Sequence, residues 1–144
     1  MQPRNMLCIF CFAGNRNQYA VHTAVLNFIQ DIHEDLANNR LYYPLEDCRK
    51  FGIDLKNASH DLTKLSSLSL FELERVEYML NNGARLAESV QGRLRYELRA
   101  IIYAARKMIS KVWEIGGDTY SIRPKLSKRE HFTILLKSLL LSAN

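Results

Sequence analysis

The chain has 144 residues, of which 47% are hydrophobic, and its formal net charge is +5. This length predicts one domain with a substantial apolar core, and the excess of positive charge favours an anionic partner, either a polyphosphate ligand or an anionic membrane surface. Nucleic acid is disfavoured as a partner, because the basic residues are not interleaved with aromatic ones.

Apolar residues recur at intervals of three and four along the chain, which predicts an all-α fold. The first expected helix, residues 5–13, is apolar almost all round and should be buried on every side. It carries Cys8 and Cys11, whose spacing suits either a zinc or redox site or two buried thiols; with no second pair nearby, we favour buried thiols. The cysteines are few and odd in number, with Cys48 as the third, and no apolar run is long enough to span a membrane. Together these features predict a cytoplasmic protein that is either soluble or peripherally membrane-associated.

The second expected helix, residues 18–38, separates an apolar face from a polar stripe. Asn27, Asp31 and Asp35 recur at four-residue intervals, which places their side chains next to one another on a helix. Such a row of oxygen ligands suits Mg²⁺, although many acidic pairs of this spacing only form a solvated face. The residues expected in the core are Val21, Val25, Phe28, Ile29, Ile32 and Leu36.

Proline, glycine and capping residues divide the middle of the chain. Pro44 should start a short helix that Gly52 closes, and residues 57–68 should form a loop with one helical turn. Ser69 and Glu72 have capping-box spacing and should open a helix that runs to about residue 90, with a weak point at residues 81–83.

The last third should hold two further helices. Residues 93–115 should form the first, ended by Gly116 and Gly117, with a loop over residues 118–126. A second capping box, Ser127 to Glu130, should open a Leu-rich helix over residues 131–142, which either packs on the body of the protein or lies on a membrane; we favour packing. The expected core residues of the first helix are Leu94, Leu98, Ile101, Ile102, Ala105, Ile109 and Val112.

Two linked motifs carry a family resemblance. The first, residues 27–35, has an Asn, Asp and Asp four apart, and the second, residues 39–44, reads Asn-Arg-Leu-Tyr-Tyr-Pro. Together they resemble the squalene and phytoene synthase family, in which Asn-x-x-Arg-Asp-x-x-x-Asp is followed by Gly-Arg-x-Tyr-x-Pro. The resemblance continues weakly through residues 93–111 and 118–123. Gln30 stands where the family has the arginine before the first aspartate.

The resemblance implies a large helical bundle of the isoprenoid-synthase type, whose cavity holds two prenyl diphosphates bound through Mg²⁺. It implies head-to-head condensation of those prenyl diphosphates, with NADPH as a further cofactor if the product is squalene. Carried over by position, Asn27, Asp31 and Asp35 would bind the metal and Arg123 a diphosphate. Tyr42 would line the reaction pocket, and Arg40 would have either a phosphate-binding role or a structural ion pair.

The family uses two aspartate-rich motifs, and this sequence contains one. No second Asp-x-x-x-Asp occurs in it, and members of the family are about twice as long. We therefore expect residues 1–144 to be a single partial domain, the C-terminal half of the fold, arising as a split subunit, a truncated product or a fragment. Alone it should be inactive, with a large exposed apolar patch that favours self-association or binding to an N-terminal half. The alternative is a catalytically inactive helical interaction protein that keeps the fold.

Overall fold

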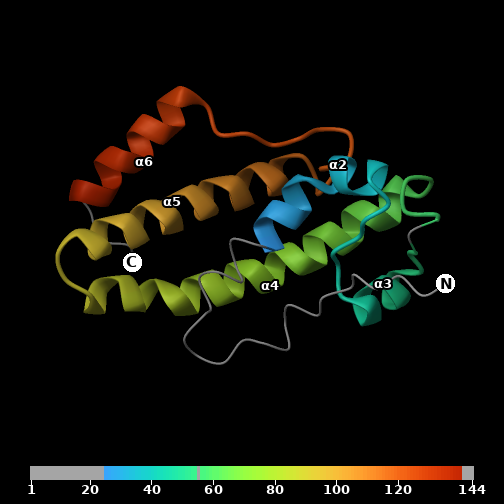
Figure 1. Cartoon of the computed structure of the whole chain (residues 1–144), viewed down its shortest axis with the longest axis horizontal. Helices are drawn as coiled ribbons and strands as arrows, with labels where there is room; N and C mark the ends of the chain where they lie inside the picture. The colour runs from blue at the N-terminus through green and yellow to red at the C-terminus, as the bar shows by residue number, and fades with distance from the viewer. Residues whose placement is uncertain (1–24, 55, 141–144) are drawn as a thin grey trace.

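The computed structural model describes residues 25–54 and 56–140, and these residues are helices and connecting loops without a strand (Figure 1). This confirms the predicted all-α class. A helical stretch over residues 25–30 comes first, and the expected helix 5–13, with Cys8 and Cys11, lies outside the described residues, as does Val21. The helices that follow are α2 (Ile32–Ala37), α3 (Leu45–Phe51), α4 (Leu62–Ser89), α5 (Arg93–Glu114) and α6 (Lys128–Leu140).

The long helices α4 and α5 form an antiparallel pair on which the other elements rest (Figure 1). Gly92 lies in the turn between them with a φ of 68°, a backbone conformation that is unfavourable for residues with a Cβ atom. Across this turn Arg99 reaches back to Glu88 with an Nη2 to Oε2 distance of 2.7 Å. The predicted helix over residues 93–115 and the predicted break before it are therefore confirmed.

The far end of α5 is fixed against α4 by a glycine. Gly116 and Gly117 end α5 with φ values of 62° and 77°, as the sequence predicted. A Cβ added at Gly117 would lie 2.6 Å from the carbonyl oxygen of Ser66 and 2.7 Å from Cγ of Leu70. Gly117 is thus required both by its backbone conformation and by the close approach of the two chain segments.

The predicted start of α4 is wrong. The helix begins at Leu62, after Asp61, whose side chain accepts a hydrogen bond of 3.2 Å from the backbone amide of Lys64. Ser69 and Glu72, predicted to cap a helix, are completely buried inside α4. The expected weak point at residues 81–83 is also helical. The reason is that apolar residues at helical spacing continue upstream of Ser69: Leu62, Leu65 and Leu68.

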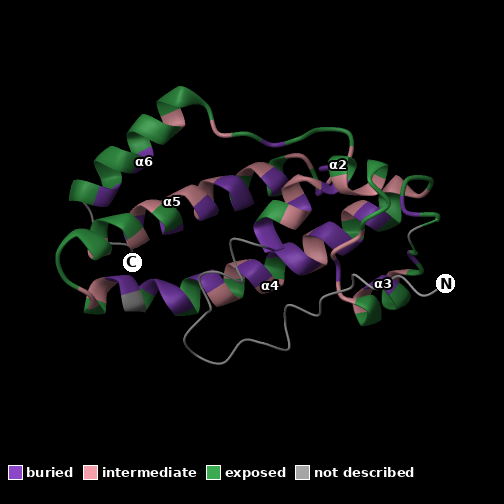
Figure 2. Ribbon diagram, in the orientation of Figure 1, coloured by how far each residue is buried: buried purple, intermediate pink, exposed green. Residues whose placement is uncertain are grey.

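The core lies between α4, α5 and the segment of residues 25–37 that crosses them (Figure 2). Phe28 and Leu36 are half-buried, and Leu94 and Ile101 are 52% and 43% exposed, so the apolar face predicted for α5 is narrower than expected. The predicted core residues that are buried are Val25, Ile29, Ile32, Ile102, Ala105, Ile109 and Val112.

The short helix α3 follows Pro44 and ends at Gly52, whose φ is 66°, as predicted. Cys48 on this helix is buried and free. Tyr43, which precedes this helix, is 2% exposed and shares a hydrogen bond of 2.7 Å with the hydroxyl of Ser69 on α4. This buried contact fixes the chain between α2 and α3 against the long helix.

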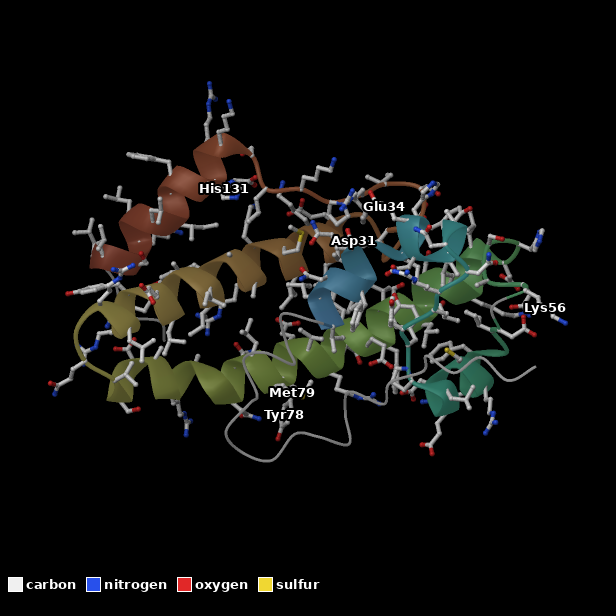
Figure 3. All side chains as sticks on the ribbon, in the orientation of Figure 1. Asp31, Glu34, Lys56, Tyr78, Met79 and His131 are labelled. Atoms are coloured by element: carbon white, nitrogen blue, oxygen red, sulfur yellow. The ribbon has the colours of Figure 1, made fainter. Side chains whose placement is uncertain are left out.

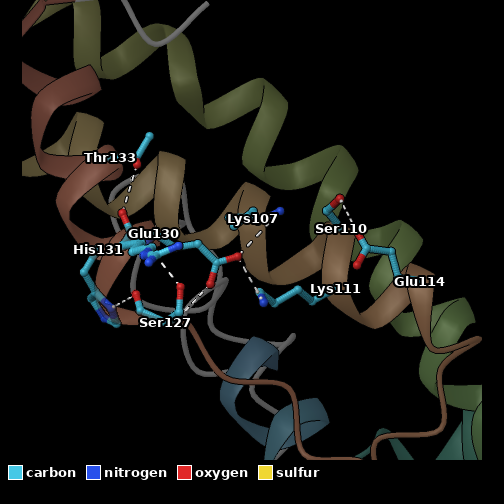
Figure 4. A network of polar contacts seen from close by, with 9 residues as sticks. Lys107, Ser110, Lys111, Glu114, Ser127, Glu130, His131 and Thr133 are labelled. Carbon is cyan, nitrogen blue, oxygen red and sulfur yellow. Dashed lines mark hydrogen bonds and ion pairs between the residues drawn. The ribbon is translucent and has the colours of Figure 1, made fainter.

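Helix α6 packs along α5, and its capping box is confirmed (Figure 4). Oε2 of Glu130 accepts from the amide of Ser127 at 2.7 Å, and Oγ of Ser127 accepts from the amide of Glu130 at 3.3 Å. Glu130 also pairs with Lys111 of α5 at 3.0 Å. Within residues 25–54 and 56–140, no helix combines the length and the apolar character needed to cross a bilayer.

Candidate diphosphate-binding site

The polar stripe lies on a helical segment that is interrupted at its central carboxylate. Residues 25–30 and 32–37 are helical, and Asp31 between them has φ −102° and ψ 13°. The backbone still makes four-residue hydrogen bonds there, from Asp31 N to Asn27 O at 2.8 Å and from Asp35 N to Asp31 O at 2.9 Å. The predicted single helix is thus a helix with a local break, and the three residues keep the predicted spacing of one turn.

Arg123 comes to this stripe from the loop that follows α5. Its Nη2 lies 2.6 Å from Oδ1 of Asp31, although the two residues are 92 positions apart in sequence. Its Nη1 donates to the carboxylate of Glu34, one turn further along the same segment (Figure 3). Arg123 and Asp31 are each about one-third exposed, so the pair is reachable from solvent. The structure therefore brings together two of the predicted site residues and adds Glu34.

Two further contacts hold the same loop on the helical segment. Nε2 of Gln30 donates to the carbonyl oxygen of Pro124 at 2.8 Å. Nδ1 of His33 lies 3.1 Å from the carbonyl oxygen of Tyr120, so Nδ1 carries the proton, and the two rings are 4.9 Å apart. Gln30 is thus an uncharged donor that positions the loop, and Arg123 is the cation next to the aspartates.

Asp35 is half-buried and has the carboxylates of Asp31 and Glu34 nearby. Burial raises the pKa of the Asp35 carboxyl, the charge of Asp31 adds to this rise, and Arg40 opposes it. Asp35 makes no ion pair with another residue of the described chain. A cation placed between Asp31 and Asp35 would favour the charged form of Asp35.

Arg40 and Tyr42 follow directly after this segment. Asn39 has a φ of 55°, a left-handed conformation that ends the helical segment, and Arg40 N then donates to Asp35 O at 2.8 Å. The half-buried ring of Tyr42 stacks on Phe28 with centroids 4.4 Å apart and an interplanar angle of 17°. The second motif thus folds back on the helix that carries the first, next to Asn27.

The side chains of the stripe offer carboxylate and amide oxygens, which Mg²⁺ accepts more readily than most transition metals do. No three His, Cys, Asp or Glu side chains of residues 25–54 and 56–140 come together as a metal site. Mg²⁺ needs fewer protein ligands, because it takes one or two carboxylates and completes its octahedron with water and substrate phosphate oxygens. Asp31 and Asp35 with the exposed amide of Asn27 fit that requirement.

A buried polar cluster on α3 and α4 was missed by sequence reasoning. Arg75 lies 3.3 Å from Glu72 and 3.0 Å from Asp47. Burial raises the pKa of Glu72 to about 8; Arg75 opposes this rise and a hydrogen bond with Asp47 adds to it. The sequence signal that could have revealed the cluster is the position of Glu72 within the apolar stripe of α4. A capping box at the exposed start of a helix would not lie in such a stripe. The cluster ties α3 to α4 and contains none of the predicted site residues.

A surface pocket between α4 and α5 is also separate from the stripe. Its volume is about 340 Å³, and it contains none of the residues expected to bind metal or diphosphate. Trp113 on its wall donates from Nε1 to Oε2 of Glu77 at 3.4 Å. The lining residues are Glu77, Asn81, Arg106, Ile109, Ser110 and Trp113.

Comparison with known proteins identifies the family. Residues 4–130 match the model of a family described as squalene/phytoene synthase, which agrees with the helical fold and with the two linked motifs. No curated protein and no solved structure matches the chain. Because the matched residues make up most of its 144 residues, the chain belongs to the squalene/phytoene synthase family.

Proposed function

We propose that this chain supplies one of the two magnesium and diphosphate sites used in the head-to-head condensation of two prenyl diphosphates. Membership of the squalene/phytoene synthase family points to a function related to prenyl transfer. Within that function we assign Asn27, Asp31 and Asp35 to the metal, and Arg123 with Arg40 to the diphosphate. Tyr42 is assigned to the wall of the reaction pocket.

The observation that carries this proposal is the contact between Arg123 and the aspartate stripe. The guanidinium group of Arg123 lies 2.6 Å from Asp31, so a diphosphate held at the stripe would have this cation within reach. Guanidinium groups bind phosphate through paired N–H donors. A diphosphate that takes Arg123 would release Asp31 and Glu34 from it, and the freed carboxylates would then be available to a cation.

The chemistry of prenyl transfer explains why these side chains are needed. An allylic diphosphate loses its carbon–oxygen bond to give a carbocation and pyrophosphate, and the negative charge on the leaving group must be neutralised. Bound Mg²⁺ would supply most of that neutralisation. Arg123 and Arg40 would add fixed positive charge, and the stacked rings of Tyr42 and Phe28 would keep water from the cation.

The proposal also requires a second aspartate-rich motif, which this sequence does not contain. We propose that another polypeptide segment supplies it and that the two segments enclose the substrates between them. NADPH would be a further requirement if the intermediate is reduced to squalene.

A thermal-shift experiment tests the assignment of the metal site. The chain, combined with a candidate polypeptide that carries the second motif, should melt at a higher temperature when Mg²⁺ and a non-hydrolysable prenyl diphosphate are added together. Asp31→Ala with Asp35→Ala should abolish the rise. The matched control is Glu46→Ala with Glu74→Ala, which removes two exposed carboxylates on α3 and α4 and should keep it. An equal rise in both double variants would exclude the site.

An inactive interaction protein is the second candidate. It is favoured by the ion pairs of Arg123, which already occupy the carboxylates of Asp31 and Glu34, and by Gln30, which adds no cation. Labelled farnesyl or geranylgeranyl diphosphate distinguishes the two functions. Turnover by the reconstituted pair would exclude the inactive protein, whereas binding without turnover would support it.

A further inference from the structure

Helix α6 has two faces of opposite exposure. Ile134 and Ser138, four residues apart, are 9% and 2% exposed and face α5. Glu130, one turn earlier on the same stripe, pairs with Lys111 at 3.0 Å and with Lys107 at 3.7 Å (Figure 4). These three residues form one row along α6 and take part in its attachment to α5.

The opposite side of α6 is apolar and open to solvent, and Figure 2 shows the helix exposed along its outer edge. On a helix of 3.6 residues per turn these positions lie together, roughly opposite the row that faces α5. A surface of this kind on a folded protein marks an interaction site. We call it the outer face of α6; its residues are Phe132 (69% exposed), Leu135 (58%), Leu136 (48%), Leu139 (60%) and Leu140 (71%).

The charges around the outer face are all of one sign. Glu130 is the only acidic residue of α6, and its carboxylate is turned toward α5. Lys128 and Arg129 are exposed at the start of the helix, and helical geometry places them at the end of the outer face. Lys137 is exposed beside it, and Lys125 is exposed in the preceding loop. The partner of this face must therefore accept apolar side chains and attract several cations.

We propose that the outer face of α6 binds the surface of an anionic lipid bilayer, with the helix lying in the plane of the interface. An amphipathic helix with aromatic and leucine side chains on one face and lysine and arginine at its borders binds such surfaces. Lipid headgroups supply the negative charge and the acyl boundary accepts the leucines. The inference goes beyond the proposed prenyl transfer and does not depend on it.

The geometry of α6 favours this orientation over the alternatives. The helix has 13 residues, which at 1.5 Å per residue is too short to cross a hydrocarbon core of about 30 Å. A second copy placed in parallel on the same face would bring Lys128 and Arg129 of one copy close to the same cations of the other, and an antiparallel copy would offer them no free acidic side chain of α6. A bilayer containing acidic lipids avoids that repulsion.

Vesicle sedimentation with the whole chain tests the proposal. The chain should sediment with vesicles of phosphatidylcholine mixed with phosphatidylglycerol and stay in the supernatant with phosphatidylcholine alone. Lys128→Gln and Arg129→Gln should each weaken binding to the acidic vesicles by roughly fivefold. A chain that stays in the supernatant with acidic vesicles would overturn the proposal.

Variants of the outer face test which surface is used. Phe132→Ser with Leu139→Ser should reduce vesicle binding by about tenfold or more. The control is Tyr78→Ser with Leu45→Ser, which removes two apolar side chains that are 70% and 47% exposed on α4 and α3; Tyr78 points away from α6 (Figure 3). This control should bind like the wild type. Equal binding by both double variants, with unchanged circular dichroism, would overturn the proposal.

Two further measurements show whether lipid or a second copy of the chain covers the outer face of α6. Phe132→Trp should add a blue-shifted emission on acidic vesicles to that of Trp113, the only tryptophan of the chain, because the new indole enters the lipid boundary. Unshifted emission would contradict burial in lipid. Sedimentation equilibrium without lipid checks the second copy: a wild-type dimer that Phe132→Ser with Leu139→Ser converts to a monomer would show that another chain covers the face and would overturn the proposal.

Discussion

At the scale of single residues, Arg123 links two parts of the chain that local sequence cannot connect. It pairs with Asp31 and Glu34 across more than 80 positions, and the groups in both pairs are partly exposed. Exposed ion pairs contribute little to stability, usually about 0–1 kcal/mol. The contribution of Arg123 to folding should therefore be small, and its proposed role is to bind the diphosphate.

Arg123→Gln tests that distinction. We expect the free energy of unfolding to fall by less than about 1 kcal/mol, whereas the thermal shift produced by Mg²⁺ and a prenyl diphosphate in the reconstituted protein should be lost. The matched control is Arg93→Gln, which breaks an exposed pair with Glu97 and should leave the shift intact. A full shift in Arg123→Gln would show that this arginine does not contact the diphosphate.

The raised pKa of Glu72 makes the stability of the folded protein depend on pH, and it sets the sign of that dependence. Its pKa is raised from 4.5 to about 8 in the folded protein, so over this range the folded chain holds a proton that the unfolded chain has released. Stability from this group is therefore fully present below about pH 4.5 and is lost as pH rises toward 8. Glu72→Gln removes the titrating group. Urea denaturation at several pH values between these limits should show a flatter loss of stability in the variant than in the wild type; parallel curves would contradict the burial effect.

At the scale of elements, two copies of one motif behave in opposite ways. Ser127 and Glu130 cap α6 on the surface, whereas Ser69 and Glu72, with the same spacing, lie inside α4. The capping box is a local signal. It does not start a helix where apolar residues at helical spacing continue upstream of it, and buried Leu65 is such a residue. Glycine and proline signals predicted the ends of α3 and α5 correctly because they act on the backbone itself.

Serine substitutions separate the two roles. Ser127→Ala should cost about 1 kcal/mol of stability through loss of the cap. Ser69→Ala should cost about 1–3 kcal/mol because it leaves the buried hydroxyl of Tyr43 without its partner. In urea denaturation, Tyr43→Phe combined with Ser69→Ala should recover much of the second loss. A double variant that shows the sum of both single losses would contradict a direct bond.

Adjacent glycines provide a matched pair for the end of α5. Gly117→Ala introduces a Cβ that would lie 2.6 Å from a backbone oxygen of α4, whereas the same change at Gly116 meets nothing within 4 Å. Both residues have positive φ, so both variants should lose about 1 kcal/mol to backbone strain. Thermal denaturation should show a clearly larger loss for Gly117→Ala. Equal losses would mean that α4 moves away at no cost.

At the scale of the whole molecule, the sequence predicted the helical class and most helix ends, but only part of the site. The stripe of Asn27, Asp31 and Asp35 follows from helical spacing, and the family resemblance assigned Arg123 to a diphosphate, whereas its contact with Asp31 became evident only in the structure. Gln30 and Glu34 were missed as partners of the loop after α5, because contacts across 89 and 94 positions depend on how α4 and α5 place that loop. The outer face of α6 became evident only when the structure showed which side packs on α5.

The central claim is that Asp31 and Asp35 bind a diphosphate through Mg²⁺, and isothermal titration measures this most directly. The chain, combined with a polypeptide that supplies the second aspartate-rich motif, is titrated with a non-hydrolysable prenyl diphosphate in excess Mg²⁺ and again with a chelator. We predict that removing Mg²⁺ weakens binding at least about tenfold in the wild type and has little further effect in Asp35→Asn. Equal affinity with and without Mg²⁺ in the wild type would contradict the account.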